Sequence, residues 1–233
     1  MAVDVEKEKQ LAAEAAAALV ESGMRVGLGT GTTVAHFLPA LARRKLTLRC
    51  VTTSPHTGEI ARQLGLSVEP FTLDRLDIAI DGADQISPDG WLVKGGGAAL
   101  TREKLVAISA ERFVVIADST KPVGALQAPV PLELLAFGLA STLRRLAPVR
   151  RRDAPLSPDG GVIADFTGPV GDPAGLAARL EATPGVVEHG LFPPEMVATI
   201  LVGRGESVER IEMAGTGPPT PATTRPSGSD PAR

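Results

Sequence analysis

A lysine and a glutamate stand on either side of three consecutive glycines, an arrangement that could move a proton on an anionic ligand. The stretch KGGGAALTREK, residues 94–104, begins with Lys94 and carries Glu103 near its end. Glycine costs about 0.5–1 kcal/mol relative to alanine in regular structure, and a linker would rarely lead directly into strong helix formers. We therefore expect the glycine backbone to approach a ligand closely, between a cation and a carboxylate base. For Glu103 alone, a solvent-facing position on a helix is the alternative.

A second glycine-rich stretch, GLGTGTT at residues 27–33, follows an apolar run and precedes a helix-forming one. Free backbone N–H groups and the helix dipole at such a turn favour an anion. The stretch is neither a dinucleotide fingerprint, because Thr32 replaces the third glycine, nor a Walker A loop, since no Gly-Lys-Ser/Thr follows. The hydroxyls of Thr30, Thr32 and Thr33 suit a terminal phosphate. A tight turn with a capping threonine is the alternative.

Two carboxylates end a third apolar run in the sequence DGAD, residues 81–84. Ligands of open α/β sheets lie beyond the carboxyl ends of strands, and Gly82 permits a sharp turn, so Asp81 and Asp84 can point into one crevice. Such a pair can hold sugar hydroxyls, share a proton or bind a divalent metal. We expect no metal, because no further Asp, Glu or His clusters nearby. An Asx turn that merely ends the strand is the alternative.

The elements that must position these residues alternate between helix and strand. This alternation indicates an α/β fold with a Rossmann-like, mostly parallel sheet flanked by helices. Thr32 or Thr33 is expected to cap the second helix, and Pro39 to kink or break it. Helices are expected over residues 5–22, 32–44, 56–65 and 98–110, and strands over residues 24–31, 46–54, 76–81 and 112–118, with a short strand near Val68.

The composition of the chain changes near its middle, where Pro122, Pro129 and Pro131 stand close together. Beyond them the pattern predicts a smaller α+β, ferredoxin-like domain over about residues 128–199. The apolar segments 196–205 and 208–213 are expected to rejoin the first sheet, so the catalytic domain would span residues 1–127 and about 200–213. Residues 214–233 are rich in Pro, Gly, Ser and Thr and are expected to be disordered. In the small domain we expect helices near 137–146 and 173–182, and strands at 149–153, 162–166 and 186–192.

Composition excludes several functions. The 233 residues carry a net charge of -3, with no Tyr and one Trp, so we expect no nucleic-acid partner. The single Cys50 cannot form an internal disulfide and is expected in the core, and the three histidines lack metal-ligand spacing. No apolar run reaches the length of a membrane span, and the charged N-terminus lacks a signal-peptide core. We therefore expect a cytoplasmic protein with no membrane partner.

Three stretches occur in an order and spacing that resemble the ribose-5-phosphate isomerase A family. They are GLGTGTT, IDGADQISPDGWLVKGGGAALTREK and FVVIADSTKPV, and a weaker likeness extends over residues 6–203. The resemblance implies interconversion of D-ribose 5-phosphate and D-ribulose 5-phosphate through an enediolate, in the non-oxidative branch of the pentose phosphate pathway. It also implies no metal or organic cofactor, and a homodimer or homotetramer.

The resemblance also implies roles for individual residues. Glu103 matches the proton acceptor, and Lys94 with the glycine N–H groups would stabilise the charge developing on oxygen. Asp81, with Asp84 holding hydroxyls, is the candidate that helps to open the furanose ring. The implied substrate-binding residues are Thr30, Gly31, Thr32, Thr33, Asp81, Gly82, Ala83, Asp84, Lys94, Gly95, Gly96, Gly97 and Lys121.

The chain departs from the family pattern at a few places. Thr32 stands where Ser is common, Gln85 replaces a usual Glu, which would slightly change the neighbouring aspartate pKa values, and the loop 193–196 is expected to be reshaped. Two other functions stay open: an isomerase or deaminase of another sugar phosphate, and a sugar-phosphate sensor that binds without turnover. A sensor would normally lack the base and carry a DNA-binding helix-turn-helix, for which we see no spare segment.

Overall fold

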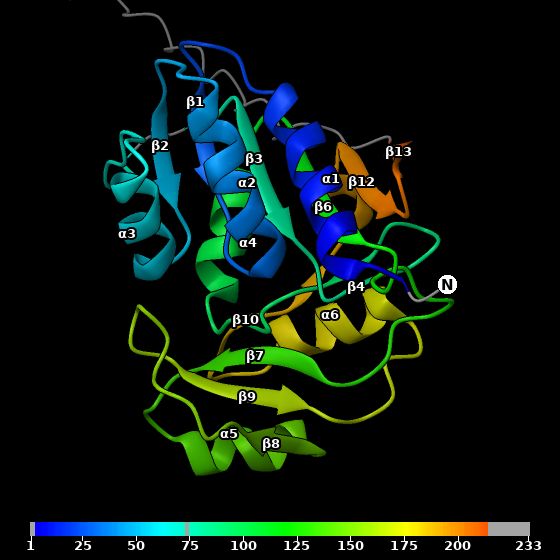
Figure 1. The fold of residues 1–233 in the computed structure, drawn as a ribbon. Coiled ribbons are helices and arrows are strands. Elements are labelled where there is room, and N and C mark those ends of the chain that lie inside the picture. Colours follow the sequence, from blue (N-terminus) through cyan, green and yellow to red (C-terminus); the bar gives the residue numbers. More distant parts are fainter. Residues whose placement is uncertain (1–2, 73–74, 214–233) are drawn as a thin grey trace, which may run out of the picture.

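A six-stranded, mostly parallel sheet forms the larger part of the molecule (Figure 1). The computed structural model describes residues 3–72 and 75–213. The sheet order is β13-β12-β6-β3-β1-β2, and only β13 runs antiparallel to its neighbour. Its strands are β1 (Arg25–Leu28), β2 (Arg49–Thr52), β3 (Ile78–Gly82), β6 (Phe113–Asp118), β12 (Thr199–Arg204) and β13 (Ser207–Glu212). The predicted fold class is confirmed, and the segments 196–205 and 208–213 rejoin the first sheet as predicted.

Helices cover both faces of this sheet. In Figure 1, α1 and α2 lie in front of the strands and α4 lies behind them. The hydrophobic cluster on the front face also includes residues of α3, whereas residues of α4 belong to the cluster on the opposite face. The helices are α1 (Val5–Ala18), α2 (Thr32–Arg43), α3 (Pro55–Gln63) and α4 (Leu100–Ile108).

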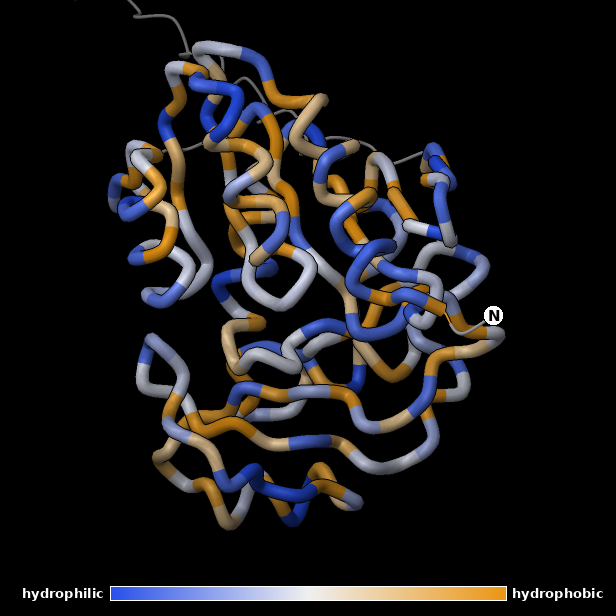
Figure 2. Tube along the Cα trace, viewed as in Figure 1, coloured by the Kyte–Doolittle hydropathy of each residue, from blue (hydrophilic) through white to orange (hydrophobic). Residues whose placement is uncertain are grey.

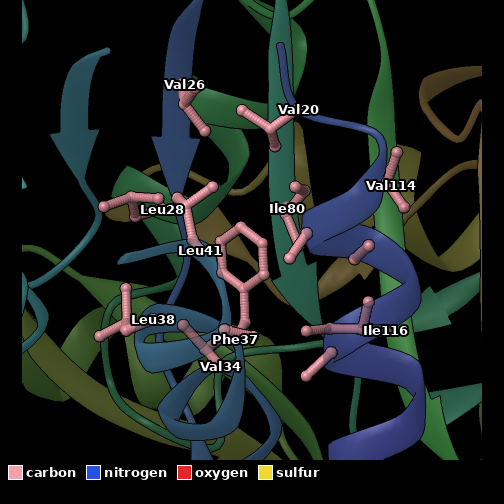
Figure 3. Packing of buried hydrophobic residues seen from close by; sticks show 14 of the residues in the cluster. Val20, Val26, Leu28, Val34, Phe37, Leu38, Leu41, Ile80, Val114 and Ile116 are labelled. Carbon is pink, nitrogen blue, oxygen red and sulfur yellow. The ribbon is translucent and has the colours of Figure 1, made fainter. Parts of the chain in front are cut away.

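The core of the front face is built around the ring of Phe37. In Figure 3 this ring lies between aliphatic side chains of α2 and of the central strands, including Leu28, Ile80 and Ile116. All of these side chains are almost fully excluded from water, and burial of apolar surface is the main favourable term in folding. Figure 2 shows the same pattern along the chain, with hydrophobic residues on the strands and hydrophilic ones gathered in loops and on outer helix faces. This core fixes the strand ends from which the loops of the site emerge.

Three features of the first two helices differ from the predictions: where α1 ends, which residue caps α2, and the effect of Pro39. α1 ends at Ala18 instead of extending to residue 22. Thr32 is the first residue of α2, and Gly31, with φ of 128°, caps it without a side-chain hydrogen bond. The same helix continues through Pro39 without a break, because the apolar residues around the proline are buried against the sheet and outweigh one lost backbone hydrogen bond.

A second, four-stranded antiparallel sheet with two helices forms the smaller part. Its order along the chain is β-α-β-β-α-β and its strand order is β10-β7-β9-β8, the ferredoxin-like arrangement that the sequence predicts. The elements are β7 (Val130–Leu134), α5 (Leu139–Leu146), β8 (Val149–Arg151), β9 (Val162–Phe166), α6 (Pro173–Glu181) and β10 (Val186–His189).

One predicted strand, residues 186–192, is divided between two sheets. β10 ends at His189, and after Gly190 the chain enters β11 (Leu191–Phe192), which pairs with β5 (Leu92–Val93), itself paired with β4 (Gln85–Ile86). A Cβ added at Gly190 would lie 2.1 Å from the backbone oxygen of Lys94, so the division depends on a residue without a side chain. The 193–196 loop contains a short 3-10 helix, η1 (Pro194–Met196).

Other expectations concern segments rather than sheets. The predicted disorder of residues 214–233 lies outside the described residues. Among residues 3–72 and 75–213, no helix has both the length and the apolar character that crossing a bilayer would require. Val68 forms an isolated bridge to Cys50 rather than a full strand.

Candidate active site

Three loops meet where the order of the large sheet reverses. The chain passes from β1 to β2 on one side and returns to β3 on the other, so the carboxyl ends of β1 and β3 are adjacent. Ligands of open α/β sheets bind at such a reversal. The loops that emerge there are residues 29–31 after β1, residues 83–84 after β3, and residues 94–99 between β5 and α4.

These loops enclose a pocket of about 90 Å³. With the exception of Asp81, every residue that the sequence analysis assigned to the site lines it. The lining residues are Thr30, Gly31, Thr32, Thr33, Gly82, Ala83, Asp84, Lys94, Gly95, Gly96, Gly97, Glu103 and Lys121.

Glu103 lies on the first turn of α4, nearer the start of the helix than the predicted boundary at residue 98 would place it. Its backbone N–H donates to the oxygen of Ala99 at 2.9 Å, and Ala99 is the N-cap residue. The side chain is only 3% exposed, so the solvent-facing alternative does not apply. A carboxyl group buried at this depth needs a charge or hydrogen-bond partner.

Lys94 supplies that partner. Its ammonium nitrogen lies 3.4 Å from Oε2 of Glu103 and 3.0 Å from Oδ2 of Asp81, and it donates to the backbone oxygen of Gly82. Burial alone would lower the pKa of Lys94, but the charges of Asp81 and Glu103 outweigh it and raise that pKa. Lys94 therefore stays positively charged at neutral pH.

The same environment acts oppositely on Glu103. Burial raises the pKa of its carboxyl group, and the neighbouring Asp81 charge adds to this, whereas Lys94 lowers it. The net result is a pKa of about 7. A carboxyl group with this pKa can accept and return a proton at neutral pH, which is what an acid–base catalyst needs.

Asp81 lies beneath the pocket rather than on its wall. Its Oδ1 accepts hydrogen bonds from the N–H groups of Thr30 at 3.0 Å and Gly82 at 2.7 Å. A Cβ at Gly29 would lie 2.1 Å from the Asp81 carboxylate, so glycine is required for this close approach. In the structure Asp81 does not line the pocket; its carboxylate holds Lys94 and two backbone N–H groups.

Asp84 does face the pocket, and the glycine triplet closes over it. The N–H of Gly96 donates to Oδ2 of Asp84 at 2.9 Å, and a Cβ at Gly96 would lie 2.9 Å from Oδ1. Gly95 has φ of 101°, a conformation that side-chain-bearing residues rarely adopt. The triplet is therefore an ordered wall of the pocket and not a linker.

The hydroxyl of Thr30 belongs to a network that the sequence analysis missed. Its Oγ1 lies 2.8 Å from Oγ1 of Thr53, 2.9 Å from Oγ of Ser54 and 3.1 Å from Oγ1 of Thr57. These residues come from the end of β2 and the start of α3. The run of hydroxyl residues TTSPHT was the available signal.

Gln85 and Cys50 do not line the pocket, and their side chains are held by hydrogen bonding and by burial in the core. Gln85 donates from Nε2 to the oxygen of Gln127 at 2.9 Å and accepts at Oε1 from the N–H of Gln127 at 2.8 Å, a pairing that a glutamate could not complete. Cys50 is buried as expected, and burial raises the pKa of its thiol to about 12. Within the described part of the chain, no three His, Cys, Asp or Glu side chains are grouped as metal ligands.

Together these groups are typical of an enzyme that transfers a proton between carbon atoms of its substrate. A buried carboxyl group with a near-neutral pKa, beside a fixed ammonium group, can remove a proton from carbon and return it. The surrounding hydroxyls, backbone N–H groups and Lys121 suit a substrate that carries hydroxyl groups and a negative charge.

Comparison with known proteins identifies the family. The family model described as ribose 5-phosphate isomerase A (phosphoriboisomerase A) matches residues 49–207. A second model, the DeoR C terminal sensor domain, matches residues 4–71. The ribose-5-phosphate isomerase A of Caulobacter sp. (strain K31) is 43% identical over 225 residues, covering 90% of this chain and 99% of that relative.

Similarity to solved structures points to the same family as the sequence comparison. The crystal structure of ribose 5 phosphate isomerase A from Neisseria gonorrhoeae has a TM-score of 0.86 and 29% identity, covering 91% of this chain and 99% of that one. A D-ribose-5-phosphate isomerase in complex with phospho-erythronic acid has a TM-score of 0.84 and 32% identity, covering 90% and 99%. The chain belongs to the ribose 5-phosphate isomerase A family, as its sequence motifs predict, and is an aldose–ketose isomerase.

Proposed function

We propose that this chain interconverts D-ribose 5-phosphate and D-ribulose 5-phosphate, with Glu103 as the group that carries the proton between C2 and C1. One observation carries the assignment of the base: the Glu103 carboxyl is buried, has a pKa of about 7 and lies 3.4 Å from the Lys94 ammonium. A base whose pKa lies near the operating pH is ionised in a large fraction of the molecules and is still strong enough to remove a proton from carbon.

The chemistry balances with this single carboxyl group. In the open-chain aldose, Glu103 removes the proton from C2, the C2–H electron pair forms the C1–C2 double bond, and the aldehyde oxygen takes up the negative charge. The same carboxyl then returns the proton to C1 while the O2 proton moves to O1. The product is the 2-ketose, and nothing is oxidised or reduced overall.

Lys94 is proposed to stabilise the charge that develops on the substrate oxygen. It is a preorganised cation in a site largely excluded from water, where electrostatic stabilisation is strongest. Asp81 would act through Lys94, because its carboxylate holds the ammonium from beneath the pocket. We therefore treat Asp81 as a positioning residue.

Ring opening is proposed to depend on Asp84, which lines the pocket, whereas Asp81 does not. A carboxylate can take the proton from the O1 hydroxyl of the furanose as the bond between C1 and the ring oxygen breaks, and return it to that oxygen, which becomes the O4 hydroxyl of the open-chain aldose. The hydrogen bond from Gly96 holds this carboxylate in one orientation.

The phosphate is proposed to lie against the start of α2 and Lys121. Thr32 and Thr33 open this helix, and both line the pocket with Lys121, so hydroxyls, helix N–H groups and a cation converge. The related isomerase in complex with phospho-erythronic acid supports a sugar-phosphate ligand for this family, because phospho-erythronic acid carries a phosphate and a carboxylate on a hydroxylated chain.

A substrate panel tests the proposal against its alternatives. Purified enzyme with a chelator is offered ribose 5-phosphate, unphosphorylated ribose, glucose 6-phosphate and glucosamine 6-phosphate. We expect turnover of ribose 5-phosphate to exceed that of the others by orders of magnitude. Preference for a hexose or amino-sugar phosphate would favour an isomerase or deaminase of another substrate. Binding without turnover would favour a sensor, the candidate to which the match over residues 4–71 points.

Three wider assignments belong to this proposal. Residues 1–127 with about 200–213 would form the catalytic domain, and about 128–199 the small domain. Self-association into a homodimer or homotetramer is supported by apolar side chains on the small part, where Phe137 is 93% exposed and Leu135 is 51% exposed. Light scattering coupled to gel filtration measures the oligomeric state.

A cytoplasmic location is inferred because a phosphorylated sugar does not cross a bilayer unaided.

A further inference from the structure

A guanidinium group from the small part of the molecule holds the glycine loop of the pocket. Arg152 follows β8, and its Nη1 donates to the backbone oxygens of Gly95 at 3.0 Å and Gly96 at 3.2 Å. We propose that Arg152 is a positioning residue for the isomerisation: it fixes these two peptide planes so that their N–H groups point away from it, toward the pocket. This inference rests on the proposed function.

The guanidinium is itself held in one orientation. Asp165, buried on β9, accepts from Nε of Arg152 at 3.0 and 2.9 Å through its two oxygens and from Nη2 at 2.6 Å. A carboxylate that binds two nitrogens on one edge of a planar guanidinium fixes its plane as well as its position. The remaining nitrogen, Nη1, is thereby directed at the loop.

Covalent geometry transmits this contact to the pocket. In a trans peptide the C=O and N–H bonds point in opposite directions. The oxygen of Gly95 shares its peptide unit with the N–H of Gly96, which donates to Asp84 at 2.9 Å. Arg152 and Asp84 thus hold opposite ends of one peptide unit, and loss of Arg152 would loosen the carboxylate proposed for ring opening.

The second peptide unit ends in a free donor. The oxygen of Gly96 shares its unit with the N–H of Gly97, a residue that lines the pocket. Over residues 3–72 and 75–213, this N–H donates to no protein acceptor. It is therefore available to a substrate oxygen, in the direction that Arg152 imposes.

The loop needs such a contact because glycine supplies little order of its own. One end of the loop is fixed, since the N–H of Lys94 donates to the oxygen of Gly190 at 2.8 Å, and within the loop the N–H of Ala98 donates to the oxygen of Gly95 at 3.1 Å, the oxygen that Arg152 also contacts. Between these points, rotation of a glycine peptide meets few steric barriers. A catalytic group misplaced by about 1 Å can reduce a rate by about 100-fold. The two hydrogen bonds from Arg152 to the oxygens of Gly95 and Gly96, which together form a clamp on the loop, should therefore affect the rate of catalysis.

The test uses Arg152→Lys and Arg152→Ala, with Arg151→Ala as the matched control. Arg151 is the preceding residue and is exposed, so this variant removes the same charge from the same strand end. For the Arg152 variants we expect kcat to fall by about 10- to 100-fold, with KM changed by less than about threefold. Addition of guanidinium ion should restore part of the activity of Arg152→Ala, which loosening of the fold alone would not allow. Activity of Arg152→Ala within twofold of wild type, or an equal loss in Arg151→Ala, would overturn the inference.

Hydrogen exchange provides a readout that does not depend on the reaction. Peptides covering residues 94–98 should exchange faster in Arg152→Ala, or in Arg152→Lys if the alanine variant does not fold, and at the wild-type rate in Arg151→Ala. Unchanged exchange in the Arg152 variants would overturn the clamp. If the wild type fails to isomerise ribose 5-phosphate while exchange responds as expected, the proposed function fails and the clamp stands.

Discussion

The ammonium nitrogen of Lys94 lies 3.4 Å from Oε2 of Glu103, and both side chains are only 3% exposed. Two opposing effects meet in this pair. Burial favours the neutral carboxyl group, whereas the lysine charge favours the carboxylate. Their balance leaves Glu103 partly ionised near neutral pH, so it can act as a base in one half of the reaction and as an acid in the other.

The pH dependence of kcat/KM should report this pKa. Glu103 must be ionised to remove a proton, and its pKa is about 7. As pH falls below 7 the base form is lost, so kcat/KM should decrease by about tenfold per pH unit. Initial rates between pH 5.5 and 8 at constant ionic strength measure this. A profile that stays level to pH 5.5 would contradict the assigned pKa.

Stability should depend on the same ionisation. The carboxyl pKa is raised from an ordinary value of 4.5 to about 7 in the folded protein. Its contribution to stability is fully present below pH 4.5 and is lost as pH rises to 7, because the unfolded chain releases this proton first. Glu103→Gln stays neutral, so its stability relative to wild type should rise across this window by as much as about 3 kcal/mol.

Urea unfolding of both proteins at pH 4.5, 5.5, 6.5 and 7.5 measures the difference in the free energy of unfolding. Glu59→Gln, the same change at an exposed position on α3, serves as the control and should show no such trend. A stability difference between Glu103→Gln and wild type that is constant over this range would contradict the raised pKa.

Asp81→Asn separates positioning from substrate contact. The Asp81 charge raises the pKa of Glu103, so its removal should move the acidic limb of the pH profile to lower pH. Because Lys94 also loses its 3.0 Å partner, kcat should fall, while KM changes little since Asp81 does not line the pocket. A rise in KM with an unmoved acidic limb would instead place Asp81 against the substrate.

Lys121→Ala should weaken binding more than catalysis. Lys121 lines the same pocket as Thr32 and Thr33 at the start of α2, where the phosphate is proposed to bind. Loss of one charged hydrogen bond, worth about 1.5–3 kcal/mol, corresponds to a KM increase of roughly 10- to 100-fold. Steady-state kinetics at several salt concentrations test this, with Lys45→Ala as an exposed control. An unchanged KM would remove Lys121 from the phosphate site.

Much of the pocket could be predicted because its residues lie in short loops after strands. Parallel strands bring their carboxyl ends to one edge of a sheet, so GLGTGTT after β1 and DGAD after β3 had to meet. The family motif added the stretch that begins at Lys94. Pocket-facing and buried positions are harder to separate within a motif: DGAD predicts that both aspartates point into one crevice, whereas only Asp84 lines the pocket and Asp81 holds Lys94.

The burial of Glu103 could not be read from its neighbours in sequence. The helix α4 that carries it contacts β7 and β10 of the small part, and the Lys94 ammonium beside it lies 5.5 Å from the Phe192 ring of β11. The strands β4, β5 and β11 have two residues each, too few to show a period.

Arg152 gave no signal in the sequence either. It is one of three consecutive arginines, and the glycine loop that it contacts lies 57 residues earlier in the chain. The register of β8 and β9 places Arg150 directly opposite Asp165, yet it is the guanidinium of Arg152, two residues further on, that binds this carboxylate.

Isomerisation of ribose 5-phosphate by Glu103→Gln tests the central claim most directly. Conversion to ribulose 5-phosphate is measured at pH 7.5 with a chelator present, and substrate affinity by calorimetry, alongside Glu59→Gln. We predict that kcat of Glu103→Gln falls by about 10²- to 10⁴-fold, while its Kd for the substrate stays within a few fold of the wild-type value. Both values should be unchanged in Glu59→Gln. Turnover by Glu103→Gln at a rate close to wild type would contradict the assignment of Glu103 as the base.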